Sequence, residues 1–267
     1  MSDDQPPVYV VGDVHGHREP LVDALREQGL VDDEEDWVGG DTELWFVGDF
    51  VDRGPDGIGV IDLVMRLQEQ APDQGGRVQA LLGNHEILLL GTYRFGDTEV
   101  SPGVAGRTFA ASWVVNGGQL SDLERLTERH EEWLLGRPLL AHAAGHLLLH
   151  SDTLEYFRWG FDVEEINNGV RAVLEGHDAE QWWEVWRRLT TRYAFRGQGG
   201  PQAAEQVLSR LGGSRIVHGH SVIADQVGLD PADISGPHLY AGGLVLGIDA
   251  GVFAGGPCLV VELPWEG

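Results

Sequence analysis

Apolar runs and helical repeats alternate along the first third of the chain. Short apolar runs at Val8–Val11, Glu43–Val47 and Gln79–Leu82 predict three strands. Between them, apolar residues recur at helical spacing over Leu21–Gln28 and Ile58–Gln70, and a fresh helical pattern starts at Glu86. This βαβαβ order is typical of a largely parallel sheet with helices on its faces, so the sequence predicts an α/β fold.

The pattern loosens after Gly91, where turn residues become frequent. A polar helix is predicted over Asp122–Leu135, with Ser121 as its cap. Trp182, Trp183 and Trp186 lie on one helical pattern, which indicates core positions rather than a substrate platform. The other predicted elements are a hairpin within residues 139–152, an aromatic helix within residues 179–195, a helix over Ala203–Leu211, and strands over Arg215–Val217, Leu244–Ile248 and Leu259–Leu263, the last two joined by a turn.

Polar turns rich in glycine follow the predicted strands. They are "GDVHG" (12–16), "GDFVDRG" (48–54), "GNHE" (83–86), the histidine of "LLLHSD" (His150) and "VHGHS" (217–221). Because ligands of open α/β sheets bind beyond the carboxyl ends of the strands, we expect these side chains to meet at one edge. Their mixture of carboxylate, amide and imidazole groups suits two divalent transition metals.

The first three motifs carry a family resemblance. Asp13, Asp49 and Asn84 are 36 and 35 residues apart, and their motifs match the pattern GDxHG, GDxxDRG and GNHE at every position. The chain therefore resembles the calcineurin-like metallophosphoesterases and, among them, bacterial or archaeal members of the phosphoprotein (Ser/Thr) phosphatase family. The resemblance extends from about Val8 to Phe253, since "GIDAGVFAGG" is similar to the family's closing strand and turn. It implies a four-layer α/β/β/α sandwich, with residues 1–267 as one domain and a helical insertion at about residues 92–141.

The resemblance also implies a ligand set for two metal ions, with Mn, Fe or Zn as the usual occupants. One ion would be held by Asp13, His15 and Asp49, and the second by Asp49, Asn84, His150 and His220. Asp49 would bridge the two ions. The reaction implied is direct attack of a metal-bridging hydroxide on a phosphomonoester, without a phosphoenzyme.

Two of these ligands lie in motifs that depart from the family pattern. His150 is followed by Ser and Asp, and His220 lies in Gly-His-Ser where Gly-His-Thr is common. His218 is the alternative ligand in the second motif, although it precedes the glycine. Outside the ligand set we also place His17, His142, His146, His177 and His238.

Arginine provides a planar, permanently charged fork for phosphate oxygens. Arg53 lies four residues after Asp49 in the same loop and is the first predicted phosphate clamp. The resemblance implies a second arginine upstream of the last ligand, for which we predict Arg196 in "FRGQGG", with Arg192 and Arg158 as alternatives.

A leaving alkoxide must be protonated, and the resemblance assigns this step to His85. His85 is adjacent to the ligand Asn84 but is not expected to bind metal. Asp52 would orient its ring. A metal-binding scaffold of the same fold would need neither an acid nor a phosphate clamp, so His85, Asp52 and Arg53 favour an enzyme over that non-enzymatic alternative.

Composition excludes several other functions. The chain has 18 basic residues, all of them arginine, and 43 acidic residues, which give a net charge of −25. This negative charge disfavours binding to duplex nucleic acid or to an anionic membrane. A chain without lysine has no P-loop, and no G-x-S-x-G elbow is present. Cys258 is the single cysteine, so no disulfide forms within the chain, and no arginine follows Arg215 to serve a cysteine-dependent phosphatase. The start "MSDDQPPVY" lacks a signal-peptide pattern, and we expect a soluble, cytoplasmic monomer.

The expected substrate is a phosphorylated protein or a small phosphoester. "GNHE" is typical of phosphoprotein phosphatases, whereas related dinucleoside tetraphosphatases more often have Asp at the last position. The segment "SWVVNGGQ" (112–119), in contrast, resembles bacterial members that act on phosphoproteins or nucleotides. We therefore predict a phosphoserine/phosphothreonine phosphatase, with a dinucleoside tetraphosphatase or another nucleotide phosphohydrolase as the alternative.

Overall fold

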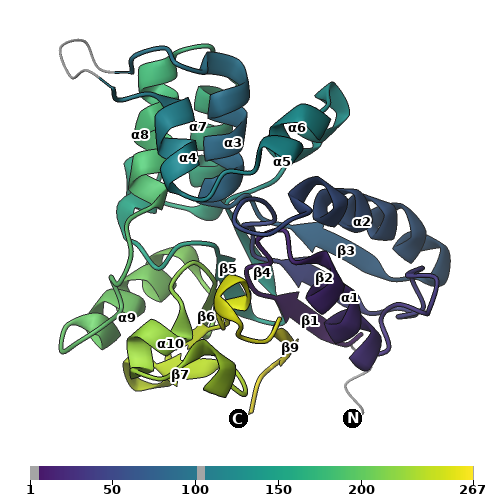
Figure 1. The fold of residues 1–267 in the computed structure, drawn as a ribbon. Helices are drawn as coiled ribbons and strands as arrows, with labels where there is room; N and C mark the ends of the chain where they lie inside the picture. The colour runs from purple at the N-terminus through teal and green to yellow at the C-terminus, as the bar shows by residue number, and fades with distance from the viewer. Residues whose placement is uncertain (1–5, 101–105, 267) are drawn as a thin grey trace.

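Two β-sheets form the centre of the molecule in the computed structural model, which describes residues 6–100 and 106–266 (Figure 1). The first sheet has the order β3-β2-β1-β9. Strands β1, β2 and β3 are parallel to one another, and β9 pairs antiparallel with β1. Its strands are β1 (Val8–Val11), β2 (Glu43–Phe46), β3 (Arg77–Ala80) and β9 (Val260–Leu263).

The second sheet has the order β4-β5-β6-β8-β7. Strands β5, β6 and β8 are parallel, and β4 and β7 pair antiparallel at its two edges. Its strands are β4 (Leu140–Ala143), β5 (His146–Leu149), β6 (Ile216–His218), β7 (His238–Tyr240) and β8 (Val245–Gly247).

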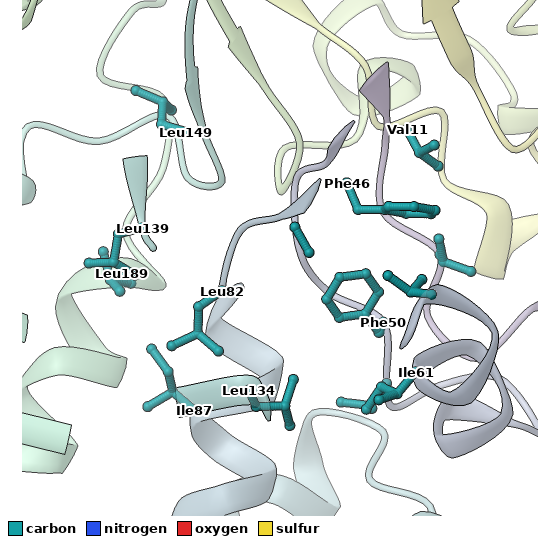
Figure 2. Packing of buried hydrophobic residues seen from close by; sticks show 14 of the residues in the cluster. Val11, Phe46, Phe50, Ile61, Leu82, Ile87, Leu134, Leu139, Leu149 and Leu189 are labelled. Carbon is teal, nitrogen blue, oxygen red and sulfur yellow. The ribbon is translucent and has the colours of Figure 1, made fainter. Parts of the chain in front are cut away.

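Alternation along the strands divides the core into layers. Val10 of β1, Leu148 of β5 and Leu246 of β8 belong to one buried cluster that fills the space between the two sheets. Neighbouring residues such as Val11 and Leu149 point the other way and join a larger cluster under the helices, part of which is drawn in Figure 2. The predicted layers of helix, sheet, sheet and helix are thus confirmed.

Helices cover the outer faces and build a separate bundle (Figure 1). Helices α1 (Arg18–Glu27) and α2 (Gly57–Gln70) lie on the first sheet, and α9 (Gly200–Leu211) and α10 (Ile223–Val227) lie beside the second. The bundle contains α3 (Asn84–Phe95), α4 (Phe109–Val115), α7 (Val163–Glu175) and α8 (Ala179–Leu189), with α5 (Leu120–Arg125) and α6 (Glu128–Leu135) at its side. Over the described ranges, no helix has the length and apolar character needed to cross a bilayer.

The predicted helix over Asp122–Leu135 is wrong, because the structure has two helices there. Leu126 is extended, with ψ at 129°, and the hydroxyl of Thr127 accepts a hydrogen bond from the amide of His130 to start α6. Ser121 is not a cap, since α5 begins after Gln119. The capping preference of threonine therefore outweighs the continuous polar pattern.

Other differences are smaller. Strand β3 lies two residues earlier than predicted, and the aromatic helix ends at Leu189 rather than near Phe195. The strands near residues 244 and 259 exist but lie in different sheets, so they do not form a hairpin. Helices α4, α7 and α10 and strand β7 were not predicted. The three tryptophans of α8 are buried, which confirms their core role.

The segment predicted as an insertion, residues 92–141, contributes the end of α3 and all of α4, α5 and α6. Residues 101–105 of that segment lie outside the described residues. The bundle also takes α7 and α8 from a later part of the chain, so it is built from two separate stretches of sequence.

Candidate metal centre

The six predicted ligands lie just beyond strand ends and are almost completely buried. Asp13 and His15 follow β1, Asp49 follows β2, and Asn84 begins α3 shortly after β3. Two more come from the second sheet, His150 after β5 and His220 after β6. None is more than 5% exposed. The ligands therefore come from both sheets rather than from one.

Asp49 lies at the centre of this group. Asp49 belongs to two groups of side chains that could each hold an ion. In the first, one ligand atom from each of His15, Asp49 and His85 lies within 4.8 Å of the others. The second group, Asp49, His150 and His220, meets the same limit. The two carboxylate oxygens face opposite sides: Oδ2 is 3.6 Å from His15 Nε2, and Oδ1 is 3.2 Å from His150 Nε2. This arrangement is the one required of a carboxylate shared between two ions.

Backbone carbonyls fix the orientation of two imidazoles. His15 donates from Nδ1 to Val51 O at 2.9 Å, and His220 donates from Nε2 to Thr190 O at 3.2 Å. The other nitrogen of each ring is thus an unprotonated acceptor on the side of the cluster. Burial and neighbouring positive groups hold the pKa of both rings well below the ordinary value, which favours the neutral form that binds metal.

His150 differs, because both of its nitrogens face oxygen acceptors. Nδ1 donates to Val47 O at 3.0 Å, and Nε2 lies 2.9 Å from Asn84 Oδ1 beside Asp49. Burial alone would lower the pKa of His150, but Asp49 and Asp13 outweigh it and raise the pKa to about 9. Nε2 of His150, Oδ1 of Asn84 and Oδ1 of Asp49 therefore converge, and a metal ion bound there would be held by these three groups.

The carboxylate of Asp13 accepts hydrogen bonds from the backbone amide of His220, at 3.0 Å to Oδ1 and 2.9 Å to Oδ2. Burial, followed by the nearby carboxylate of Asp249, raises the pKa of Asp13 well above its usual range. Asp13 Oδ2 lies 4.0 Å from His15 Nε2. That separation is too long for a hydrogen bond, but two ligands of one cation with bonds of about 2.1 Å can lie up to about 4.2 Å apart, so both groups are within reach of one ion. The residues present thus fit a pair of transition-metal ions.

Glu86 was not predicted as a functional residue, although it is the last letter of "GNHE". Its carboxylate accepts hydrogen bonds from the backbone amides of Asp49 and Gly83, both at 2.9 Å, and from that of Phe50 at 2.7 Å. Burial, with a contribution from Asp49, raises the pKa of Glu86 to about 7. Glu86 therefore holds the backbone of the loop that carries Asp49.

The loops that carry these groups have an unusual backbone. Positive φ values occur at His15 (46°), Asp49 (55°), Asp52 (66°), Arg53 (66°) and His220 (64°). Non-glycine residues adopt this region at an energetic cost and persist there only when surrounding contacts hold them. Such a concentration in one place is typical of a functional site.

His85, Asp52 and Arg53 form a connected group beside the ligands. His85 donates from Nδ1 to Asp52 Oδ2 at 2.7 Å, and its Nε2 accepts from Arg53 Nη2 at 3.1 Å. Nε2 is also 4.0 Å from Asp49 Oδ2, so it faces the centre. The Arg53 guanidinium lies 4.1 Å from the centre of the Phe253 ring, which also packs edge-on against His15.

The predicted second clamp, Arg196, contacts α10 and Tyr193. It donates to Gln226 O at 3.2 Å and stacks on Tyr193, at 4.4 Å from its ring centre. Arg192 lies in the segment whose Thr190 carbonyl binds His220, and its charge contributes to the lowered pKa of His220.

The alternative ligand His218 has no nitrogen free for a metal. Its Nδ1 donates to Gly219 O and its Nε2 accepts from Tyr240 Oη, both at 2.7 Å. The two unusual motifs "HSD" and "GHS" bind each other, since Ser221 Oγ donates to Asp152 Oδ1 at 2.5 Å. Asp152 also accepts the amide of Tyr193 at 2.8 Å.

Comparison with known proteins agrees with this geometry. Residues 6–224 match the family described as calcineurin-like phosphoesterase. The chain belongs to this family. The match covers both sheets up to β6 and includes every predicted metal ligand.

Some relatives of the chain are named as protein phosphatases and others as dinucleoside tetraphosphatases. The chain is 31% identical over 117 residues to "Shewanella-like protein phosphatase 2" of Arabidopsis thaliana, covering 43% of this chain and 29% of that protein. It is 31% identical over 147 residues to a symmetrical bis(5'-nucleosyl)-tetraphosphatase of Bordetella pertussis, covering 55% of this chain and 44% of that protein. The chain thus spans less than half the length of these relatives.

Solved structures show the same fold. A cold-active protein-tyrosine phosphatase of a Shewanella species aligns with 97% of this chain and 75% of its own, at a TM-score of 0.71 and 21% identity. A protein serine/threonine phosphatase from Saccharomyces cerevisiae aligns with 93% of this chain and 68% of its own, at a TM-score of 0.57 and 16% identity. At these identities the likeness is one of fold.

Proposed function

We propose that this chain is a dinuclear-metal-dependent phosphomonoesterase that removes phosphate from phosphoserine and phosphothreonine residues of proteins. The observation that carries the proposal is the position of Asp49, whose two oxygens face two separate groups of imidazoles. When bound, a pair of Mn, Fe or Zn ions supplies a nucleophilic water at neutral pH and neutralises charge on the phosphoryl group. Family membership supports this chemistry.

The chain's own residues divide the remaining work. Asp13, His15, Asp49, Asn84, His150 and His220 would hold the ions. The guanidinium of Arg53 contacts Nε2 of His85 and the ring of Phe253, which places it beside the candidate ligands. From there it would bind the phosphoryl oxygens of the substrate. His85 faces the centre with Nε2, while Asp52 accepts a hydrogen bond from its Nδ1. When Nε2 is protonated and no longer accepts from Arg53, the ring would be placed to donate that proton to the leaving oxygen as a general acid.

A second clamp is proposed from the segment between α8 and α9. Arg196, expected from the sequence, and Arg192, whose charge acts on His220, are the two candidates. Arg192→Ala and Arg196→Ala compared at equal metal content distinguish them, because loss of a clamp lowers kcat/KM far more than loss of a surface charge.

A symmetrical dinucleoside tetraphosphatase is the second candidate function. It is favoured by the Bordetella relative, which aligns with more of this chain than the Arabidopsis protein does. Monomeric state and cytoplasmic location stay predictions.

A substrate panel at a fixed Mn²⁺ concentration tests the proposal. It contains phosphoserine, phosphothreonine and phosphotyrosine peptides, diadenosine tetraphosphate and p-nitrophenyl phosphate. The proposal predicts the highest kcat/KM for the phosphoserine or phosphothreonine peptide, with release of inorganic phosphate. A preference for diadenosine tetraphosphate, with two ADP as products, would establish the second candidate. Absence of metal-dependent hydrolysis of every member would overturn both.

A further inference from the structure

One helix of the bundle makes a direct hydrogen bond to the proposed acid–base group. Trp113 of α4 is buried, and its Nε1 donates to Asp52 Oδ1 at 2.6 Å. The other oxygen of Asp52 accepts from His85 Nδ1 at 2.7 Å. Asp52 is completely buried, so its carboxylate links the indole to the imidazole away from solvent.

The same stretch of chain contacts the loop after β2 at two further points. The amide of Arg53 donates to Gly117 O at 2.7 Å, and the amide of Ile58 donates to the buried Asp122 Oδ1 at 3.2 Å. Residues 113–122 therefore bind the loop at Asp52 and Arg53 and the first turn of α2 at Ile58. Asp52 and Arg53, both with φ at 66°, lie inside the part that is held.

An indole N–H is a donor with no acceptor function, so its bond to a carboxylate fixes one oxygen and leaves the other for a second donor. Without that bond the Asp52 side chain can rotate, and the ring of His85 loses its fixed orientation. The His85 amide is bound separately to Asp49 Oδ1 at 3.0 Å, so the backbone of His85 does not depend on the indole. Loss of the indole bond should therefore disturb the ring more than the metal ligands.

We propose that Trp113 is a positioning residue for proton donation, acting through Asp52 to orient the ring of His85. The proposal deepens the proposed function and rests on it. It assigns the helical bundle a part in the chemistry: α4 packs against α3, the helix that starts with Asn84 and His85, and it also binds the carboxylate that orients His85.

Trp113→Phe removes the donor and keeps an aromatic ring. The matched control is Trp182→Phe in α8, because Trp182 is also buried in the bundle and donates from Nε1, but to Gly176 O at 3.0 Å. Each variant is tested on a phosphoserine peptide, whose alkoxide needs a proton, and on p-nitrophenyl phosphate, whose leaving group does not. Metal content is measured in both.

The proposal predicts that Trp113→Phe lowers kcat for the phosphoserine peptide roughly 10- to 100-fold, as expected for one hydrogen bond to a charged group. The effect on p-nitrophenyl phosphate should be under about 3-fold at unchanged metal content, and Trp182→Phe should affect both substrates alike. Equal losses on the two substrates in Trp113→Phe, or a pattern shared with Trp182→Phe, would overturn the positioning role.

A second measurement is independent of turnover. The proton that His85 shares with Asp52 should give a downfield imidazole N–H signal by NMR, which Trp113→Phe should shift or broaden and Trp182→Phe should leave in place. If Trp113→Phe does not fold, site-specific replacement of residue 113 by benzothienylalanine, an isostere of tryptophan without the N–H, takes its place. A signal unchanged in either variant at position 113 would overturn the proposal. Failure of the proposed function is recognised separately, as absence of hydrolysis by the wild-type protein.

Discussion

The backbone amide of His220 donates to both carboxylate oxygens of Asp13, although the two residues are 207 positions apart in the sequence. Asp13 follows the first strand of one sheet, and His220 follows a late strand of the other. This bond connects the two sheets at the candidate metal centre. It places a carboxylate from one sheet beside imidazoles from the other.

Gly219 makes this approach sterically possible. A Cβ on Gly219 would lie 1.9 Å from Asp13 Oδ1, closer than any non-bonded contact allows. Gly219→Ala should therefore displace the Asp13 carboxylate and lower metal affinity and kcat/KM by roughly 100-fold or more. Gly236→Ala is the control, because a Cβ there meets nothing within 4 Å. Titration calorimetry with Mn²⁺ measures the affinity, and equal values for the two variants would contradict the steric account.

Glu86→Gln tests the support of the shared carboxylate. Each carboxylate oxygen of Glu86 accepts hydrogen bonds from backbone N–H groups. In the glutamine variant, the side-chain NH₂ would replace one of these oxygens and leave the backbone donors beside it unsatisfied. We expect a loss of roughly 2–4 kcal/mol in the free energy of unfolding, measured with urea. Glu124→Gln on the exposed side of α5 is the control. A loss no larger than that of the control would show that Glu86 does not hold the loop.

His85→Asn separates acid catalysis from metal binding. If His85 is the general acid, kcat for a phosphoserine peptide should fall roughly 10²–10⁴-fold, the loss should be smaller for p-nitrophenyl phosphate, and metal content should stay the same. Arg53→Ala should instead reduce both activities alike, because the clamp binds the transferred group itself.

Metal analysis of His85→Asn also tests a different role. His85 lies within 4.8 Å of the ligand atoms of His15 and Asp49, so it could itself bind an ion. Loss of one ion from the variant would assign His85 to the ligand set, and equal losses on the two substrates would mean that it orients the site. His177→Asn, an exposed histidine, provides the baseline.

The raised pKa of His150 predicts how the metal-free protein responds to pH. Because the pKa is about 9 in the folded state and near 6.5 in an unfolded chain, His150 stabilises the fold below pH 6.5, and this contribution is lost as pH rises through about 9. Thermal unfolding of the metal-free protein should therefore show a Tm that falls between pH 7.5 and 9.5. With Mn²⁺ bound, or in His150→Asn, that fall should be much smaller. A Tm that does not fall in the metal-free wild type would contradict the assignment.

Local patterns in the sequence were sufficient for much of the fold. Strands β1 and β2 and the motifs after them were predicted because apolar runs end there in glycine and a polar residue, a signal contained in a few adjacent positions. The break between α5 and α6 also has a local signal in Thr127, but the polar pattern on both sides concealed it. Strand β7 has three residues at the edge of a sheet and carries too short a pattern to be recognised.

The parts of the site that could not be predicted depend on contacts between distant segments. Nothing near Trp113 in the sequence indicates that its indole binds Asp52, and the bond between Ser221 and Asp152 joins positions 69 residues apart. The contacts of Arg196 with Tyr193 and Gln226 depend on the path of the chain after α8, which sequence spacing does not determine. The resemblance supplied the predicted ligand set, and the fold shows that its members come from both sheets.

Metal analysis of Asp49→Asn, combined with hydrolysis of p-nitrophenyl phosphate, tests the central claim most directly. Asp49 is the one predicted ligand that belongs to both groups, and an amide cannot neutralise two cations. The wild-type protein should bind two ions per chain, and Asp49→Asn should lose at least one of them together with most of the activity. Two ions per chain with near-normal turnover in Asp49→Asn would contradict a shared carboxylate and the dinuclear mechanism built on it.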